Sequence, residues 1–242
     1  MKMITKKTIS DIEPDFEAGE IILIDKSVRK SSFDCVYKVR KATGAAKVGH
    51  TGTLDPNATG LVIVCTGKMT KEISQIQCLE KTYTGIITLG KTTSSYDAET
   101  EFISEKSCEF VTEEQVLKTR YKFIGSINQI PPMYSAIKKN GKALYHFARK
   151  GVDVERKPRE VFILNFEITK IDLPNIHFEI TCSKGTYIRV IAFDFGAELG
   201  CGAYLKTLRR TKVGNLHVDD ALTIDEFKEF AQRFSLVSSE IN

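Results

Sequence analysis

The sequence predicts an α+β, or mixed α/β, fold in which helices and loops flank a central, largely antiparallel mixed sheet. Three observations support this class. Short apolar runs of strand length alternate with amphipathic helical segments. Two alternating segments, residues 161–171 and 176–182, flank the sequence Leu-Pro-Asn and predict a hairpin. The chain has 242 residues, 42% of them hydrophobic and 27% charged, which is typical of a soluble globular protein of one large or two small domains.

The elements of the first half follow from local patterns. An apolar run at residues 19–25, bounded by Gly and charges, predicts a buried strand. Ser31 or Ser32 caps a helix in which Phe33 and Val36 share a helical period. Residues 47–60 contain three glycines and a proline without any amphipathic period, and therefore predict a structured loop. Three further elements are expected: a strand at 61–65, a short helix at 68–76 and a strand at 81–89.

Helix signals dominate the second half. Thr112 and Gln115 form a capping box for a helix that runs to about Tyr121. A turn is expected at Asn140-Gly141. Three more helices are predicted, at residues 143–149, at 186–199 and after the capping pair Thr223 and Glu226, where Ile224, Phe227, Ala231 and Phe234 form one stripe.

Basic residues are concentrated in three segments, although the formal net charge is only +4. Residues 26–47 carry seven basic side chains and one acid, and residues 137–160 carry eight and three. Residues 206–212 add four more without an acid. If these segments share a face, they form a footprint for a polyanion. For any single cluster, the alternative is scattered, solvated lysine and arginine.

Several classes of protein are excluded. The longest apolar runs, residues 21–24 and 61–65, are too short to span a membrane, and the basic N-terminus is not followed by the apolar stretch of a secretory signal. The six cysteines occur singly, without zinc-ligand spacing, and are expected to be reduced and buried. These features predict a cytoplasmic protein without a disulfide framework.

One motif must be set aside. Residues 85–92 satisfy the phosphate-binding pattern G-x-x-x-x-G-K-[ST]. The four intervening residues, however, continue an alternating strand, and the sequence that follows does not open a helix. Nucleotide hydrolysis is therefore not expected.

Asp55 is the first candidate for chemistry. It is the only acid between Asp34 and Glu72, and it precedes Pro56 in the glycine-rich loop, five residues after His50. A lone carboxylate in a basic neighbourhood is ionised and available as a nucleophile or base. Asp before Pro is also a common turn former, so the spacing alone leaves both interpretations open.

This loop, Gly49–Gly60, resembles the catalytic loop of the bacterial TruB family of tRNA pseudouridine synthases. Three further stretches match the same family in order, and the likeness covers roughly residues 20–214. They are Lys81-Thr-Tyr-Thr to Leu-Gly90, Gln129-Ile-Pro-Pro-Met-Tyr-Ser-Ala-Ile-Lys138 continuing to Arg149, and Cys182-Ser-Lys-Gly-Thr-Tyr-Ile-Arg189 continuing to Gly200.

The resemblance implies an enzyme that isomerises uridine 55 in the tRNA T loop to pseudouridine, without a cofactor or a metal. It makes Asp55 the nucleophile. It makes Tyr83 the aromatic residue that stacks on the target base and takes the C5 proton. Arg189 would pair with Asp55 through its planar guanidinium. Without the resemblance, Tyr83 could be a half-buried strand aromatic and Arg189 a surface residue.

The resemblance also implies how the substrate binds. The target base must leave the loop, and His50 would stack within the remodelled RNA. Tyr187 and Leu208 would line the pocket, although packing alone could explain Tyr187. The partner is the T arm of tRNA, bound by a monomer without a protein partner or a membrane. Phosphate contacts are expected from the basic segments, with four named candidates: Lys26, Lys138, Lys142 and Arg149.

The expected organisation is a catalytic domain at residues 1–214, with an RNA-binding insertion around 120–160. Residues 215–242 would form a short extension with one helix in place of a full RNA-binding PUA domain. The family pattern is broken at Ser27, Asn57 and Glu99-Thr100. Two rival functions are less well supported: a noncatalytic RNA-binding or tRNA-folding protein, against which the matched catalytic residues argue, and a guide-RNA-dependent synthase, which normally carries long basic tails and an attached PUA domain.

Overall fold

The protein is described from a computed structural model that covers residues 3–139 and 141–235. Its contacts divide the chain into two compact units. Unit 1 contains the chain up to Tyr83 and from Arg209 onward, and unit 2 contains Thr84–Leu208. Strands β5 (Lys81–Leu89) and β13 (Ala203–Val213) contribute residues to both units. The boundary predicted after Gly214 therefore falls within unit 1.

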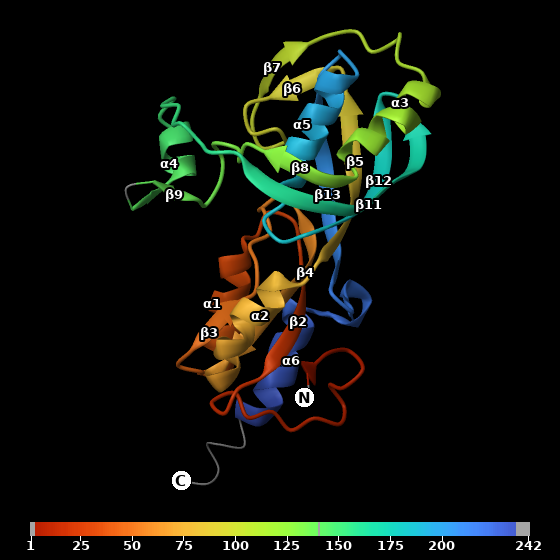
Figure 1. Ribbon diagram of the computed structural model, residues 1–242. Coiled ribbons are helices and arrows are strands. Elements are labelled where there is room, and N and C mark those ends of the chain that lie inside the picture. The colour runs from red at the N-terminus through yellow and green to blue at the C-terminus, as the bar shows by residue number, and fades with distance from the viewer. Residues whose placement is uncertain (1–2, 140, 236–242) are drawn as a thin grey trace. The chain divides into compact units, whose positions relative to one another are not determined.

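Unit 1 is a small mixed sheet with helices packed on it (Figure 1). Strand β2 pairs in parallel with β1 and β15 and antiparallel with β4, which in turn pairs with β3 and β13. The elements of unit 1, besides its parts of β5 and β13, are β1 (Met3–Ile4), β2 (Ile21–Lys26), α1 (Ser32–Thr43), β3 (Val48–His50), β4 (Thr59–Thr66), η1 (Gly67–Glu72), α2 (Ile73–Cys78), β14 (Leu216–His217), η3 (Val218–Asp220), β15 (Leu222–Thr223) and α6 (Ile224–Ser235).

Local sequence sets the limits of α1, the helix that begins closest to the candidate loop. Ser31 caps it, and a capping box with Asp34 satisfies the first free backbone N–H groups. Gly44 ends it in the left-handed conformation, with φ of 70°. Its buried face lies next to α6, whose buried side chains include Phe227 and Phe230 (Figure 1).

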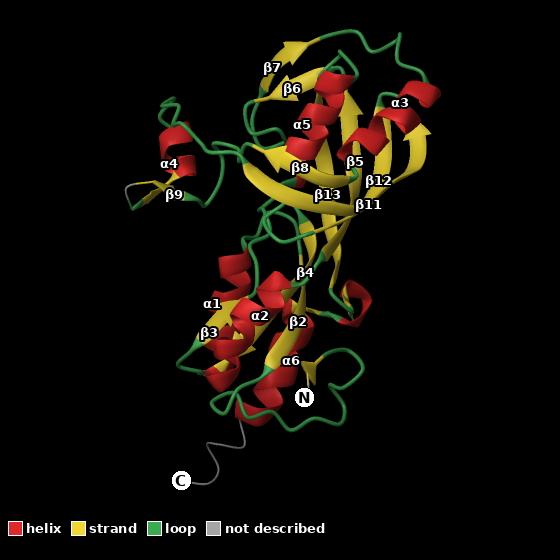
Figure 2. Ribbon diagram, viewed as in Figure 1, coloured by secondary structure: helices red, strands yellow, loops and turns green. Residues whose placement is uncertain are grey.

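Unit 2 is built on a second part of the sheet, in the order β13-β5-β12-β11-β8 (Figure 2). The predicted hairpin is confirmed, since β11 and β12 pair antiparallel. The elements of this unit, besides its parts of β5 and β13, are β6 (Lys91–Thr93), β7 (Phe102–Glu105), α3 (Glu113–Thr119), η2 (Arg120–Phe123), β8 (Gly125–Gln129), β9 (Lys138–Lys139), β10 (Lys142–Ala143), α4 (Leu144–Ala148), β11 (Arg159–Asp172), β12 (Asn175–Cys182) and α5 (Ile188–Glu198).

Aromatic packing fixes α5 on the sheet of unit 2. The ring of Phe195 lies 5.7 Å from the rings of both Phe123 and Phe166, measured between centroids. Phe166 also meets Phe178 edge to face, at 6.2 Å. Such tilted and edge-to-face pairs add to the free energy gained by burial. They hold α5 firmly, and with it Arg189.

The predicted fold class is confirmed, with corrections of detail. Strand β3 lies inside the segment predicted as a loop, and β13 was not predicted as a strand. All six cysteines, which lie in the described part of the chain, are free; four are buried, but Cys78 is exposed and Cys108 partly exposed. The expected turn includes Asn140, which lies outside the described residues. None of the described helices has both the length and the hydropathy that a membrane span requires.

Candidate active site

The loop that carries Asp55 connects two neighbouring strands of unit 1, β3 and β4. The N–H of Thr51 donates to the carbonyl of Ile63 (3.1 Å) and so holds the start of the loop against β4. The N–H of Ala58 donates to the carbonyl of Asp55 (3.1 Å), which closes a tight turn over Pro56 and Asn57. The interpretation of Asp55 as a turn former is therefore correct as far as the backbone is concerned.

The backbone is held on both sides of Asp55. The Ser32 hydroxyl accepts from the N–H of Leu54 (2.8 Å) and donates to the Leu54 carbonyl (3.3 Å). On the other side, the N–H of Arg29 donates to the carbonyl of Pro56 (2.8 Å). Asp55 itself stays partly exposed. A fixed backbone with an accessible carboxylate suits a reacting group.

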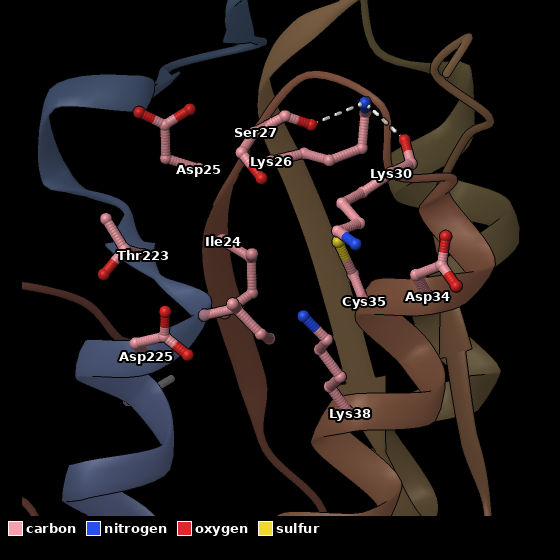
Figure 3. Close-up of a pocket in the computed structure, with 11 residues that line it drawn as sticks. Ile24, Asp25, Lys26, Ser27, Lys30, Asp34, Cys35, Lys38, Thr223 and Asp225 are labelled. Atoms are coloured by element: carbon pink, nitrogen blue, oxygen red, sulfur yellow. Dashed lines mark hydrogen bonds between the residues drawn. The ribbon is translucent and has the colours of Figure 1, made fainter. Parts of the chain in front are cut away.

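Lys26 lies beneath this loop, with 1% of its surface exposed. Its ammonium lies within hydrogen-bond distance of the carbonyls of Ser27 (3.1 Å) and Lys30 (2.6 Å), which Figure 3 shows. It also lies within hydrogen-bond distance of the carbonyls of Pro56 (3.3 Å) and Ala58, so its three N–H groups are shared among four acceptors. Burial lowers the pKa of Lys26 to about 8, a shift that the nearby Asp55 carboxylate opposes. A buried ammonium bonded to carbonyls cannot reach a phosphate, so its location does not fit the predicted RNA contact. Lys26 instead positions the loop.

Arg210 ties the two ends of the loop together. This side chain is 2% exposed, and its Nε and Nη2 donate to the carbonyls of Leu61 (2.7 Å) and Gly52 (3.2 Å). The N–H of Gly52 in turn donates to Nδ1 of His50 (3.2 Å). Burial, followed by the Arg210 guanidinium, lowers the pKa of His50, which is therefore neutral at pH 7. A neutral, partly exposed ring is suited to stacking.

Within the basic segment at residues 206–212, which was predicted to be part of a phosphate footprint, two of the four cations are engaged inside the protein. Arg209 makes a two-pronged ion pair with Asp25, at 3.0 and 2.7 Å, and Arg210 is buried on the loop. Two of its four cations thus serve the structure of unit 1. Composition alone could not reveal this, because a buried and an exposed arginine look the same in a sequence.

A cavity of about 270 Å³ lies between β2, α1 and the start of α6 (Figure 3). Charges of both signs line it, but each of its three carboxylates has a partner. Asp25 pairs with Arg209, Asp34 accepts from Ser31, and Asp225 pairs with Lys228. Among the described residues that line this cavity, no carboxylate is therefore left without a partner.

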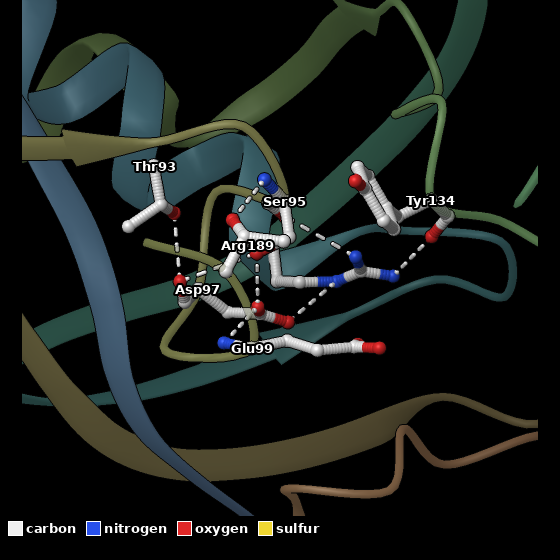
Figure 4. A network of polar contacts seen from close by, with 7 residues as sticks. Thr93, Ser95, Asp97, Glu99, Tyr134 and Arg189 are labelled. Carbon is white, nitrogen blue, oxygen red and sulfur yellow. Dashed lines mark hydrogen bonds and ion pairs between the residues drawn. The ribbon is translucent and has the colours of Figure 1, made fainter. Parts of the chain in front are cut away.

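Arg189 stands in unit 2, on the first turn of α5, and is 4% exposed. Its guanidinium donates to the carbonyls of Ser95 (3.2 Å) and Tyr134 (3.0 Å), and its Nε lies 3.6 Å from a carboxylate oxygen of Asp97 (Figure 4). Asp97 is itself held by the Ser95 hydroxyl (2.6 Å) and the N–H of Glu99 (2.9 Å). The predicted role of Arg189 is compatible with a guanidinium oriented in this way.

The sequence did not reveal that Asp97 would hold Arg189 or that Arg210 would hold the Asp55 loop. The only sequence signal for Asp97 was its place in the polar turn that begins at Thr93. That turn bends sharply at Tyr96, whose φ is 65°. Non-glycine residues rarely adopt this conformation, and they do so mainly where the surrounding structure fixes it.

The remaining predicted pocket residues lie on well-defined elements. Tyr83 is 9% exposed on β5, in unit 1. In unit 2, Leu208 is partly buried on β13. Tyr187 precedes α5 as its N-cap, where its N–H and carbonyl both bond the side chain of Gln129, at 3.0 and 3.2 Å. Asp55, His50, Lys26 and Tyr83 thus belong to unit 1, and Arg189, Tyr187 and Leu208 to unit 2.

The three other cations predicted to bind RNA are exposed and lie in unit 2. Lys138 and Lys142 sit on the small β9–β10 hairpin, and Arg149 follows α4. A cavity of about 270 Å³ beside the hairpin is lined by five basic side chains and a single acid, Glu155. The five are Lys138, Lys139, Arg156, Lys157 and Arg159. Such a surface attracts a polyanion.

The described residues do not provide the ligand set that a metal ion requires. Among residues 3–139 and 141–235, no three or more His, Cys, Asp or Glu side chains gather closely enough to hold a metal ion.

The fold and the Asp55 loop define the class: this is a pseudouridine synthase fold. A crystal structure of a Cbf5-Nop10-Gar1 complex superposes with a TM-score of 0.72 at 24% identity, over 96% of this chain and 60% of that one. A structure of an H/ACA RNP bound to a substrate RNA gives 0.68 at 22% identity, over 92% and 56%. At these identities the likeness concerns the fold.

Sequence comparison then identifies the family. Residues 40–188 match the TruB family pseudouridylate synthase N-terminal domain, and residues 189–236 match the tRNA pseudouridylate synthase B C-terminal domain. The tRNA pseudouridine synthase B of Flavobacterium johnsoniae is 46% identical over 90% of this chain and 98% of its own length. That of Chlorobium chlorochromatii is 49% identical, over 86% and 84%. The chain belongs to the TruB family of pseudouridine synthases, and is an isomerase that converts uridine to pseudouridine in tRNA.

Proposed function

We propose that this enzyme modifies uridine 55 in the T loop of tRNA and that Asp55 is its nucleophile. The observation that supports the proposal is that hydrogen bonds hold the backbone of the Asp55 loop. Ser32 holds Leu54, while Arg29 and Lys26 hold Pro56, so the backbone on both sides of Asp55 is fixed. The carboxylate remains partly exposed, in a position to react.

The reaction breaks the N1–C1′ bond of uridine and forms a C5–C1′ bond. A carboxylate oxygen of Asp55 bonds to the sugar or to the base, and that bond breaks again when the product forms. The proton on C5 is lost and N1 gains one, so atoms and charge balance without a cofactor. In this scheme Tyr83 stacks on the base and accepts the C5 proton, as the family resemblance implies.

Arg189 is the proposed partner of Asp55. Its guanidinium is oriented by Asp97, Ser95 and Tyr134, which leaves few alternative rotamers. A planar, fixed guanidinium can hold a carboxylate ionised and aligned. This pairing rests on the family motif that contains Arg189, and a substitution series tests it.

Substrate binding would combine extrusion of the base with contacts to phosphates. Removing a base from a folded loop costs a few kcal/mol in lost stacking, and a stacking side chain offsets part of that cost. The neutral ring of His50 is suited to this role, and Tyr187 and Leu208 are proposed to line the pocket. The exposed cations Lys138, Lys142 and Arg149 would contact phosphates of the T arm. We expect the enzyme to act in the cytoplasm as a monomer without a protein partner.

Release of tritium from a T-arm RNA that carries 5-tritiated uridine tests the proposal directly, because the C5 proton is lost only when the base is rejoined through C5. The purified chain alone should release tritium from this RNA. Release only after a guide RNA is added would favour the guide-dependent rival. Binding without any release would favour a noncatalytic RNA-binding protein.

A further inference from the structure

The start of α1 carries an exposed surface that the proposed mechanism does not use. We define the α1 surface as Val28, Arg29, Phe33 and Tyr37. Val28 is 51% exposed, Phe33 66% and Tyr37 59%, and Arg29 is also exposed. Phe33 and Tyr37 are one helical turn apart and therefore lie on the same face of α1.

Arg29 has an unfavourable backbone conformation. Its φ is 62°, in the left-handed region that glycine adopts freely and other residues adopt at a cost. This conformation directs the Arg29 N–H to the carbonyl of Pro56. Glycine would make the same hydrogen bond without the strain. Arginine at this position therefore suggests a use for its side chain.

The Arg29 side chain has no polar partner among the described residues. The guanidinium of Arg29 makes no hydrogen bond or ion pair with any part of the chain that the structure describes. The rings of Phe33 and Tyr37 likewise make no ring contact within residues 3–139 and 141–235. An exposed cation and two exposed aromatic rings within nine residues of the chain offer the two kinds of contact that bind single-stranded nucleic acid, charge for a phosphate and rings for bases.

The α1 surface is continuous with the candidate nucleophile loop. Ser32, the neighbour of Phe33, bonds both backbone groups of Leu54, and Arg29 bonds Pro56. Asp55 lies between these two attachment points. Lys41, which is exposed, lies one helical turn after Tyr37 on the same face of α1. The one acid on this stretch, Asp34, is engaged with Ser31.

We propose that the α1 surface binds the unpaired RNA beside the target uridine. The guanidinium of Arg29 holds a phosphate, and Phe33 and Tyr37 stack on bases that become unstacked when the uridine is extruded. This inference rests on the proposed function, since it assigns a part of the same RNA to a second surface. The positive charge around the two rings favours RNA over a protein partner.

Substitutions of Arg29 separate the side chain from the backbone. Arg29→Gly keeps the left-handed backbone, so the melting temperature should be equal or higher. The Kd for a labelled T stem-loop should rise about threefold or more, and the slope of log Kd against log salt should fall by about one. Arg29→Lys retains the charge and should keep the wild-type slope. Arg233→Ala, which removes a cation near the end of α6, should change neither quantity.

Substitutions of the rings test the stacking. Phe33→Ala and Tyr37→Ala should each raise Kd about fivefold or more without changing the salt slope. Wild-type affinity in both ring variants and in Arg29→Gly would overturn the proposal. A change of oligomeric state on size-exclusion chromatography, with RNA affinity unchanged, would also overturn it, because the surface would then bind protein. If the wild type binds the stem-loop but releases no tritium, the proposed function fails while these binding results still decide the α1 surface.

Discussion

The ammonium nitrogen of Lys26 lies 3.3 Å from the carbonyl oxygen of Pro56, the residue that follows the candidate nucleophile Asp55. The same ammonium reaches Ala58, so it spans the tight turn that Asp55 begins. Buried carbonyls that are left without a hydrogen-bond donor would cost about 1–3 kcal/mol each. Lys26 donates hydrogen bonds to these carbonyls and so fixes the position of the turn that carries Asp55.

Lys26→Met should therefore impair catalysis more than binding. Methionine fills a similar volume but donates no hydrogen bond, so the Asp55 turn loses its support. We expect kcat at saturating T-arm RNA to fall about tenfold or more, because a small displacement of the nucleophile has a large effect on rate. The Kd should change less than about threefold, and the salt slope should not change.

Lys30→Met is the matched control for this substitution. It removes an exposed cation four residues away and leaves the backbone carbonyl that Lys26 bonds. Its kcat should equal that of the wild type. If Lys26→Met lowered the salt slope by one unit with kcat unchanged, Lys26 would contact a phosphate and the positioning role would be refuted.

Arg189→Lys should be severely impaired although the charge is retained. A lysine cannot donate to Ser95 and Tyr134 while it also lies along the Asp97 carboxylate, because it has no planar fork. Tritium release should fall about a hundredfold or more, with stem-loop affinity within about tenfold. A near-normal rate would mean that neither the fork nor its pairing with Asp55 matters.

The basic surface beside β9 should determine the salt dependence of binding. Removing Lys138, Lys139 and Lys142 together should flatten the log–log slope of affinity against salt by about one unit for each phosphate that is no longer neutralised. The rate at saturating RNA should be preserved, since none of the three lies in the Asp55 loop. An unchanged slope would place this hairpin off the RNA.

Asp194 should make unit 2 sensitive to pH. Burial, followed by the neighbouring Glu198, raises the pKa of Asp194 to about 6. The folded state therefore holds a proton that the unfolded chain releases near pH 4, and stability falls as pH rises from about 4 to 6. Asp194→Asn should stabilise the protein at pH 8 by about 1–2 kcal/mol, less than full linkage because the carboxylate is partly exposed.

Thermal melts of the wild type and of Asp194→Asn, recorded between pH 4 and 8, measure this effect. The two melting temperatures should converge near pH 4 and separate as the pH rises through 6. A constant difference across the range would show that Asp194 titrates normally.

Much of the fold could be predicted because local signals agree with the tertiary structure. Ser31 and Thr112 cap helices as predicted, and the alternating residues around Leu-Pro-Asn form the β11–β12 hairpin. Strand β13 could not be predicted, because four basic side chains interrupt its pattern. Two of these cations find partners only in the tertiary structure, Arg209 on Asp25 and Arg210 on the loop.

The sequence motifs predicted the candidate site residues, but they did not predict the buried residues that hold those site residues in place. Asp55, His50 and Arg189 were found because they lie in family-like stretches. Lys26 was expected on the surface, since lysine is rarely buried, yet four carbonyls hold it inside. The turn at Asp97 carries no comparable signal, because its importance comes from a contact with a residue 92 positions away along the chain, Arg189.

The central claim is that Asp55 is the nucleophile of a pseudouridine synthase, and one measurement tests it most directly. Asp55→Asn keeps the size of the side chain and the backbone hydrogen bonds of the turn, but an amide is not a nucleophile at neutral pH. Tritium release from 5-tritiated T-arm RNA should be abolished, while the Kd for the same RNA stays within about tenfold of the wild type. Residual turnover above a few per cent, with RNA binding intact, would contradict this account and make Asp55 an auxiliary residue.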